Sequence, residues 1–257
     1  MSDDKVLMIS EEAKATFVRD GVVIVRNIFA DDRIWQFREN LQRYLLEVVP
    51  KIPKKDVFFQ DKASREDLDG LLRLEKMHKH DAYYAGLLQE MVPTAKALLG
   101  EPVTAEGVSL FDKAAAIGEP TPPHQDGHYF MLEPNLAVTL WVPMEPADES
   151  NGCVRYVRGS HRCGLREHRP SNVFGFSLGV SDFGPQDLAH EIVAAVEPGD
   201  LIAHHSLTIH RTTANTSSRS RRALGLVYFG SRCVVDAKVR DAQTEKAHRR
   251  WRDKGRL

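Results

Sequence analysis

The sequence predicts an α+β fold in which N-terminal helices pack against a β-sandwich or jelly roll. Apolar residues recur at helical spacing in the first hundred residues, and from residue 101 short apolar runs alternate with turns rich in Gly, Pro, Asn and Asp. Helices followed by many short strands are typical of that class. We therefore expect one domain, with a helical part at about 1–100, a jelly-roll core at about 101–235 and a C-terminal helix at about 240–253.

The helical part contains three helices and one strand, and each has recognisable ends. Ser10 is a good N-cap with acidic residues after it, and Gly21 and Gly100 stop the helical patterns that precede them. A run of β-branched residues indicates a buried strand, and apolar residues at helical spacing indicate an amphipathic helix. The expected elements are a helix over 10–20, a strand over 22–25, a long helix over 31–49 and a helix over 82–99.

The second part of the chain predicts short strands and one long connection. Residues 162–189 show little periodicity, and an insertion of that length in a compact domain is usually a lid or a binding loop. The clearest strands are expected over residues 103–116, 137–142, 154–157, 191–196, 201–204 and 223–231.

Composition excludes several kinds of partner. The chain has 257 residues, 42% of them hydrophobic, and a formal net charge of −1. This charge gives no electrostatic reason to expect nucleic acid or an anionic membrane as a partner. No apolar run reaches about 18 residues, and the N-terminus lacks the order of a signal peptide. Three cysteines without CxxC spacing fit reduced thiols, so we expect a cytoplasmic protein.

The stretch 122–129 contains half of a predicted metal site. His124 and Asp126 are two residues apart, and on a β-strand side chains at that spacing leave the same face. With His210 as a third ligand, they would form the facial triad of non-haem Fe(II) oxygenases. A His-x-Asp tripeptide also occurs by chance, so the alternative is a loop histidine beside a turn aspartate.

Arg221 follows His210 and indicates a binding site for a carboxylate. An arginine at this distance can lie on the next strand of a small barrel, deep in the same cavity. Its planar guanidinium binds a carboxylate through two hydrogen bonds. A dicarboxylate co-substrate that chelates iron at one end needs such a partner at the other.

Several ordered motifs together resemble the phytanoyl-CoA dioxygenase family of Fe(II)- and 2-oxoglutarate-dependent oxygenases. His124-Gln125-Asp126 is similar to the family's ligand pair, and Arg221 follows the distal histidine at the family's spacing. The resemblance covers nearly the whole chain, although Arg158 stands where the family usually has proline before Gly-Ser-His. The other motifs that carry it are Gly21–Val25, Leu110–Lys113, Trp141–Glu145, Ser150–His161 and Pro198–Leu201.

The resemblance implies a cupin-like double-stranded β-helix and a set of site residues. His124, Asp126 and His210 would hold Fe(II), with 2-oxoglutarate and O2 as co-substrates. The expected reaction is hydroxylation, or a related oxidation, of a C–H bond with release of succinate and CO2. The residues implied to bind 2-oxoglutarate are Arg221, Lys113, Gln125, Trp141 and Thr212.

The sequence specifies the substrate less well. Tyr129 is a candidate for the substrate pocket, with ordinary packing as the alternative. One of His204 and His205 is expected to face the cavity, with His205 favoured. No long Lys/Arg tract indicates a CoA phosphate site, so we expect a small polar molecule whose specificity is set by residues 50–80 and 162–190. A homo-oligomer is left open.

Two other functions remain open at this point. A cupin-like protein could bind a metal or a ligand without redox chemistry, but it would have no use for Arg221. Halogenating relatives have Gly or Ala in place of the carboxylate ligand, so Asp126 argues against a halogenase.

Overall fold

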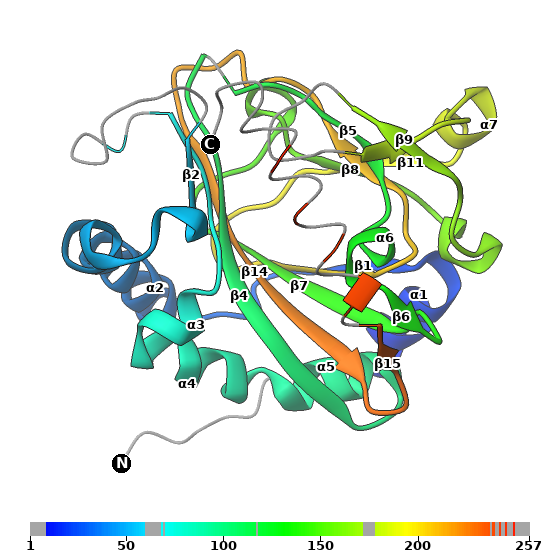
Figure 1. Ribbon diagram of the computed structural model, residues 1–257, viewed down its shortest axis with the longest axis horizontal. Helices are drawn as coiled ribbons and strands as arrows, with labels where there is room; N and C mark the ends of the chain where they lie inside the picture. Colours follow the sequence, from blue (N-terminus) through cyan, green and yellow to red (C-terminus); the bar gives the residue numbers. More distant parts are fainter. Residues whose placement is uncertain are drawn as a thin grey trace.

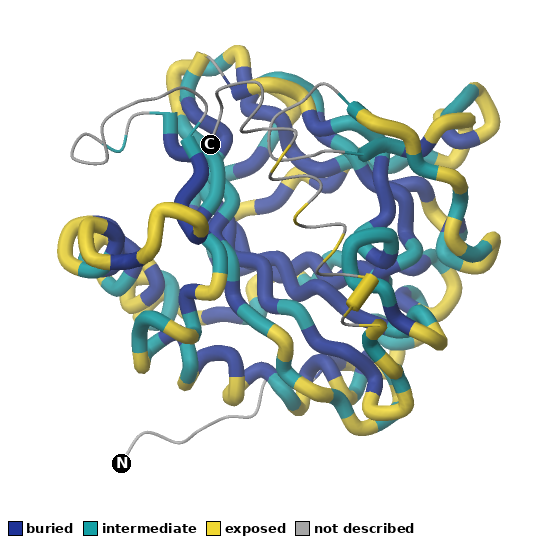
Figure 2. Tube along the Cα trace, in the orientation of Figure 1, coloured by how far each residue is buried: buried dark blue, intermediate teal, exposed yellow. Residues whose placement is uncertain are grey.

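The computed structural model describes residues 9–59, 68, 70–116, 118–171 and 178–236, and five positions near the C-terminus: 238, 239, 242, 245 and 249. Two antiparallel sheets face each other across the middle of the molecule, and helices cover the outer face of the larger sheet (Figure 1). The strands of both sheets are mostly buried, whereas exposed residues lie on loops and on the outer sides of helices (Figure 2). The predicted α+β fold with a jelly-roll core is confirmed.

The larger sheet, called here the major sheet, has seven strands in the order β1-β12-β7-β14-β4-β3-β2. Its long central strands β14 and β4 pair from Arg221 opposite Lys113 to Gly230 opposite Val103, with one shift of register between Val227 and Tyr228. Its strands are β1 (Val22–Val25), β2 (Val57–Phe59), β3 (Leu71–Leu74), β4 (Val103–Lys113), β7 (Ala137–Pro143), β12 (Leu201–His205) and β14 (Arg221–Gly230).

The minor sheet has four strands in the order β11-β8-β13-β5. From β12 onward the chain crosses from one sheet to the other at every strand, to β13 and then to β14, which is the winding of a double-stranded β-helix. The minor strands are β5 (Thr121–His124), β8 (Val154–Val157), β11 (Glu191–Ala194) and β13 (His210–Thr212). Two small two-stranded sheets pair β9 (His168–Pro170) with β10 (Leu178–Val180) and β6 (Leu132–Glu133) with β15 (Val234–Val235).

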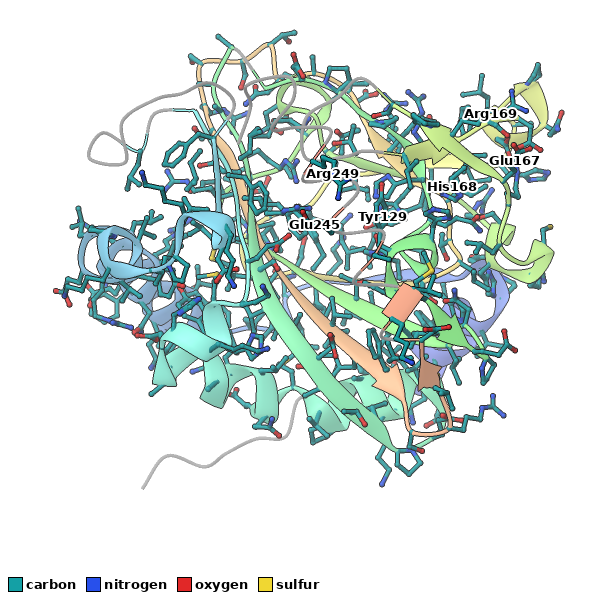
Figure 3. The ribbon with its side chains drawn as sticks, viewed as in Figure 1. Tyr129, Glu167, His168, Arg169, Glu245 and Arg249 are labelled. Carbon is teal, nitrogen blue, oxygen red and sulfur yellow. The ribbon has the colours of Figure 1, made fainter. Side chains whose placement is uncertain are left out.

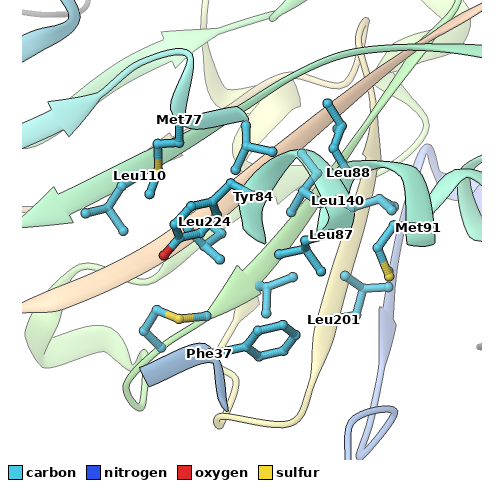
Figure 4. Close-up of a cluster of buried hydrophobic side chains, with 14 of the residues drawn as sticks. Phe37, Met77, Tyr84, Leu87, Leu88, Met91, Leu110, Leu140, Leu201 and Leu224 are labelled. Carbon is cyan, nitrogen blue, oxygen red and sulfur yellow. The ribbon is translucent and has the colours of Figure 1, made fainter. Parts of the chain in front are cut away.

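A hydrophobic layer joins the helices to the outer face of the major sheet. Its contacts come from side chains on both elements, because alternate residues of each strand face the helices. Figure 4 shows this layer, in which Phe37, Tyr84, Leu87, Leu88 and Met91 from the helices surround Leu110, Leu140, Leu201 and Leu224 from the sheet. The helices of this layer are α1 (Glu11–Asp20), α2 (Asp31–Arg43), α3 (Met77–His80), α4 (Ala82–Glu90) and α5 (Val92–Leu99). Two short helices, α6 (Gly127–Phe130) and α7 (Pro185–Leu188), contribute no residue to it.

The helix expected over 82–99 is two helices that meet at Met91. Pro93 lies in the first turn of α5 and has no N–H to bond to the carbonyl of Gln89, so a continuous helix would lose that hydrogen bond. The helix expected over 31–49 continues beyond α2 as a π-helical turn (Tyr44–Val48) and a 3-10 turn (Val49–Lys51). Other 3-10 turns are Lys54–Asp56, Glu149–Asn151 and Ser160–Cys163.

Elements that the sequence did not predict are short. β2, β3 and α3 lie within 50–80, and β5 and β13 hold three or four residues each, too few for a periodic pattern. The described part of 162–190 contains β9, β10 and α7 and is not structureless. The C-terminal helix predicted at about 240–253 lies largely outside the described residues; within it, Ala242, Glu245 and Arg249 are described and are helical.

Among the described residues, no helix combines the length and apolar character that crossing a membrane requires.

Candidate metal centre

Three aromatic rings lie side by side on neighbouring strands of the minor sheet. His210 in β13 is directly opposite His124 at the end of β5 and opposite Tyr156 in β8. Residues that face each other across antiparallel strands project from the same face. The ring centroids of His124 and His210 are 4.2 Å apart, and those of Tyr156 and His210 are 5.5 Å apart. All three side chains are buried.

Asp126 lies beside these two histidines, but the backbone that places it there differs from the prediction. The expectation that His124 and Asp126 share one face of a strand is wrong, because β5 ends at His124. Asp126 has helical backbone angles, φ −56° and ψ −34°, and its carbonyl accepts hydrogen bonds from the N–H groups of Tyr129 and Phe130 in α6. The chain turns from strand to helix between the two residues, and this turn brings the carboxylate beside the imidazole.

The three side chains present donor atoms to one point. One ligand atom from each of His124, Asp126 and His210 lies within 4.8 Å of the others. Oδ1 of Asp126 is 3.7 Å from Nε2 of His124 and 3.6 Å from Nε2 of His210. Since metal–nitrogen and metal–oxygen bonds of this kind measure about 2.1 Å, donors at these separations can hold one ion between them. Two imidazoles and one carboxylate fit Fe(II) with open positions left over.

Hydrogen bonds fix the orientation of both imidazoles. Nδ1 of His124 lies 2.9 Å from the carbonyl oxygen of Pro122, and Nδ1 of His210 lies 3.0 Å from that of Thr208. Each Nδ1 therefore carries the proton and each Nε2 presents its lone pair toward the ion. Burial lowers the pKa of both histidines, which favours the neutral form that ligation requires.

The two oxygens of the Asp126 carboxylate have different neighbours. Oδ1 faces the Nε2 atoms of the two histidines, whereas Oδ2 lies 3.0 Å from Nε2 of His204 and accepts a hydrogen bond of 2.9 Å from Oγ1 of Thr139. Burial alone raises the pKa of this carboxyl, but His210 and the hydrogen bond from His204 outweigh burial and hold the pKa well below its ordinary value. The carboxylate is thus ionised.

Two buried cations lie at one end of the major sheet. Arg221 opens β14 and is directly opposite Lys113, the last residue of β4. The ammonium group of Lys113 donates to the carbonyl oxygen of Glu119, and burial together with Arg221 lowers the pKa of Lys113 to about 7. The buried Nε–H of Arg221 has no hydrogen-bond acceptor, and neither cation forms an ion pair, within the part of the chain that the structure describes. A buried cation without a counter-ion is costly, so an anionic ligand fits this end of the site.

The family model for phytanoyl-CoA dioxygenase (PhyH) matches residues 17–223, which is most of the chain. The chain belongs to the phytanoyl-CoA dioxygenase family. A mouse relative, "Phytanoyl-CoA dioxygenase, peroxisomal", is 28% identical over 245 residues, which cover 90% of this chain and 71% of the relative. As a member of this family with an intact His-Asp-His group, the protein is an oxygenase that uses iron and 2-oxoglutarate.

Solved structures share the fold of this oxygenase. The α-ketoglutarate-dependent carbocyclase SnoK from nogalamycin biosynthesis has a TM-score of 0.72 at 22% identity, over 93% of this chain and 90% of that chain. EvdO2 from Micromonospora carbonacea var. aurantiaca, solved as a complex with 2-oxoglutarate, has a TM-score of 0.69 at 21% identity, over 90% of this chain and 95% of that chain. The predicted cupin-like jelly roll agrees with both.

The remaining residues expected to bind the co-substrate of this oxygenase lie nearby and differ in what they contact. The ring of Trp141 lies beneath the guanidinium of Arg221. Oγ1 of Thr212 accepts a hydrogen bond from the backbone N–H of Thr121, which joins β13 to β5. The amide of Gln125 is used by the backbone: it donates to the carbonyl oxygens of Gly164 and Leu207 and accepts from the N–H of Arg166. Gln125 therefore ties the ligand turn to two loops.

Tyr129 lies next to the metal ligands, between the two sheets in the view of Figure 3. Its ring centroid is 6.2 Å from that of His124, and its hydroxyl donates to the backbone carbonyl oxygen of Leu178 in β10. The rings of His128 and His168 stack beside it with centroids 4.4 Å apart. The 162–190 segment thus reaches the metal centre through β9 and β10.

Of the two adjacent histidines of β12, the one that faces the metal centre is not the one that was favoured. His204, and not the favoured His205, faces the metal ligands, because neighbouring residues of a strand project to opposite faces. The His205 ring packs instead 6.3 Å from that of Phe17 in α1 and 5.4 Å from that of His161. Tyr156 and Thr139 are polar groups of the centre that were not predicted from the sequence, and His204 was the less favoured of its two candidates. Their inward direction depends on a register between distant strands that no local pattern reveals.

Proposed function

We propose that this oxygenase hydroxylates a C–H bond of a small, polar molecule, with 2-oxoglutarate converted to succinate and CO2. One observation carries the proposal: the His124–Asp126–His210 group shares the interior between the sheets with Arg221, a buried cation that lacks a carboxylate partner among the described residues. When bound, iron and 2-oxoglutarate supply the activation of O2. The protein supplies positions, charges and exclusion of water.

The residues divide into two groups in this proposal. His124, Asp126 and His210 would hold the ion and leave coordination positions for the co-substrates. Arg221 would pair with the distal carboxylate of 2-oxoglutarate, and Lys113 would add a second positive charge beside it. Trp141 holds the guanidinium in place by a cation–π contact.

Two alternatives fit these groups less well. A halogenase needs an open ligand position where Asp126 places its carboxylate, and hydrogen bonds hold that carboxylate in place. A cupin-like binding protein without redox chemistry has no need of a cation buried beside the metal ligands. The first alternative therefore leaves the Asp126 carboxylate unexplained, and the second leaves the costly buried charge of Arg221 unexplained.

The substrate is proposed to be a small molecule because the names of this protein's relatives refer to such substrates. The mouse relative is named for phytanoyl-CoA, and SnoK is named as a carbocyclase of nogalamycin biosynthesis. Its polar character is proposed from the polar side chains beside the ligands, Tyr129, His128 and His168. The Tyr129 hydroxyl and the ring nitrogens of His168 are hydrogen-bonded to backbone groups, so among these three the His128 imidazole is the group proposed to contact the substrate. We also propose a reducing compartment such as the cytoplasm, because Cys153, Cys163 and Cys233 are free thiols.

The proposal is tested with anaerobic protein, Fe(II) and 2-oxoglutarate. Chelation of the ion by 2-oxoglutarate is expected to give a visible charge-transfer band, and admission of O2 to give succinate. His210→Ala and Asp126→Ala should lose both signals, whereas His190→Ala, outside the centre, should keep them. Absence of the band from the wild-type protein, or of succinate with every member of a broad panel of polar metabolites, would overturn the proposal.

A further inference from the structure

The side chain of His204 enters the metal centre from the major sheet. It lies in β12 directly opposite Thr139 of β7, and both residues are buried. Both contact the same atom, Oδ2 of Asp126, at 3.0 Å for the His204 Nε2 and 2.9 Å for the Thr139 hydroxyl. Oδ2 is therefore held by the major sheet, while Oδ1 alone faces Nε2 of His124 and of His210 in the minor sheet.

The direction of these hydrogen bonds follows from chemistry. An ionised carboxylate only accepts, so Nε2 of His204 and the hydroxyl of Thr139 both donate to Asp126. The other ring nitrogen of His204, Nδ1, lies 3.1 Å from the hydroxyl of Tyr156. In a neutral imidazole this nitrogen accepts, so Tyr156 donates. A directed chain runs from Tyr156 through His204 to Asp126.

Tyr156 fixes the far end of this chain. It is fully buried, and its ring stacks on that of His210 at an interplanar angle of 28°. The same tyrosine thus touches one ligand by stacking and orients another through His204. Since its only hydroxyl proton is used by His204, Tyr156 cannot also donate to a carboxylate of the co-substrate.

We propose that His204, supported by Tyr156 and joined by Thr139, is a positioning residue that keeps Asp126 bound to the metal through one oxygen. The inference rests on the proposed function in one respect, that Asp126 is a ligand. A carboxylate can bind an ion through both oxygens, and in a six-coordinate site this would occupy a position that 2-oxoglutarate or O2 needs. By holding Oδ2 in hydrogen bonds, His204 and Thr139 keep that position open.

Co(II) provides a readout that does not depend on turnover, because its visible absorption changes with the number and geometry of its ligands. The experiment titrates full-length apo protein with Co(II) and then titrates the loaded protein with 2-oxoglutarate. His204→Leu and the isosteric Thr139→Val are expected to alter the Co(II) spectrum. They should also weaken 2-oxoglutarate binding to the loaded protein about 10–100-fold, the range typical of partners that orient metal ligands.

Two further variants separate positioning from packing. His204→Gln can still donate to Asp126 and accept from Tyr156, so it should restore much of the wild-type spectrum. Tyr156→Phe keeps the stacked ring and removes the hydroxyl, and should shift the spectrum in the same direction as His204→Leu. Tyr228→Phe is the matched control, because it also loses a buried hydroxyl bond, to the carbonyl oxygen of Leu88, but on the helix side of the sheet. It should lower stability and leave the Co(II) spectrum unchanged.

The possible results distinguish this inference from the proposed function. If the wild-type protein binds Co(II) and 2-oxoglutarate, and His204→Leu and Thr139→Val bind both with unchanged spectra and affinities, the positioning role is refuted and the proposed function stands. If one variant fails to fold, the other still decides. If the wild-type protein itself binds no Co(II), or if its binding survives Asp126→Ala, both are refuted.

Discussion

The guanidinium carbon of Arg221 lies 5.3 Å from the ring centroid of Trp141. The two residues come from neighbouring strands of the major sheet, β14 and β7. This contact holds the guanidinium charge over an apolar ring, where water is excluded. A carboxylate bound to the guanidinium at this position would interact with it strongly.

Replacing Arg221 by Ala should weaken 2-oxoglutarate binding by about 2–4 kcal/mol, because the variant loses a desolvated charged pair. The measurement is the dissociation constant of 2-oxoglutarate from the Co(II)-loaded protein. Arg219→Ala is the matched control, since Arg219 is half-exposed and pairs with Asp148 at the surface. Unchanged affinity in Arg221→Ala would remove this residue from the co-substrate site.

Binding of 2-oxoglutarate should take up protons above neutral pH. Burial and Arg221 lower the pKa of Lys113 to about 7, so this amine is largely neutral at pH 8.5 in the absence of ligand. A carboxylate bound nearby favours the charged form and should raise the pKa again. Calorimetry at pH 8.5 in two buffers with different ionisation enthalpies measures the uptake, which Lys113→Met should abolish. Equal heats for the wild-type protein in both buffers would contradict the prediction.

Asp112→Asn should stabilise the protein at high pH. Burial, opposed by Arg222, raises the pKa of Asp112 to about 6 from an ordinary value of 3.8. The folded state therefore binds this proton more tightly than the unfolded state, and stability falls as pH rises from about 4 through 6. At pH 8 the variant should gain about 1–3 kcal/mol in the free energy of unfolding, an advantage that shrinks as pH falls below 6.

Asp148 is a control of opposite sign, and urea unfolding between pH 4 and pH 8 measures the stability of both variants. Hydrogen bonds from Ser150 and Arg219 lower its pKa to about 2, so its contribution is present above the ordinary value and is lost as pH falls through about 2. Asp148→Asn should therefore lose stability at pH 8. The same pH trend in both variants would show that the two carboxyls do not act as described.

Gly21→Ala should destabilise the fold far more than Gly100→Ala. Both glycines end a helix with positive φ, +74° and +73°, so alanine is strained at either position. An added Cβ at Gly100 meets nothing within 4 Å, whereas at Gly21 it would lie 2.5 Å from Oγ1 of Thr208 and 2.3 Å from Nδ1 of His161.

The expected costs of these two variants differ accordingly. Backbone strain alone should cost about 1 kcal/mol at Gly100, and displacement of two side chains should bring the total to about 2–4 kcal/mol at Gly21. Urea unfolding of both variants measures the difference. Equal decreases in the free energy of unfolding would indicate that the side chains of Thr208 and His161 move aside without an energetic cost.

Local patterns predicted much of the fold because they act within one element. Ser10 caps α1 and Gly21 ends it in the left-handed conformation, and the β-branched run at Val22–Val25 forms β1 with the predicted bounds. The patterns failed where a short element depends on its neighbours. β5 contains two prolines and β13 has three residues; β13 forms against the edge of β8, and β5 forms against the other edge of β13.

The sequence by itself determined which residues could bind the metal and the dicarboxylate, namely His124, Asp126, His210 and Arg221. These candidates follow from residue chemistry and from the order of residues along the chain. Tertiary structure decided how they meet. A turn after β5, not a shared strand face, brings Asp126 to His124. The pairing of β12 with β7 decided that His204 and not His205 points inward, because a shift of one residue reverses every side chain of a strand.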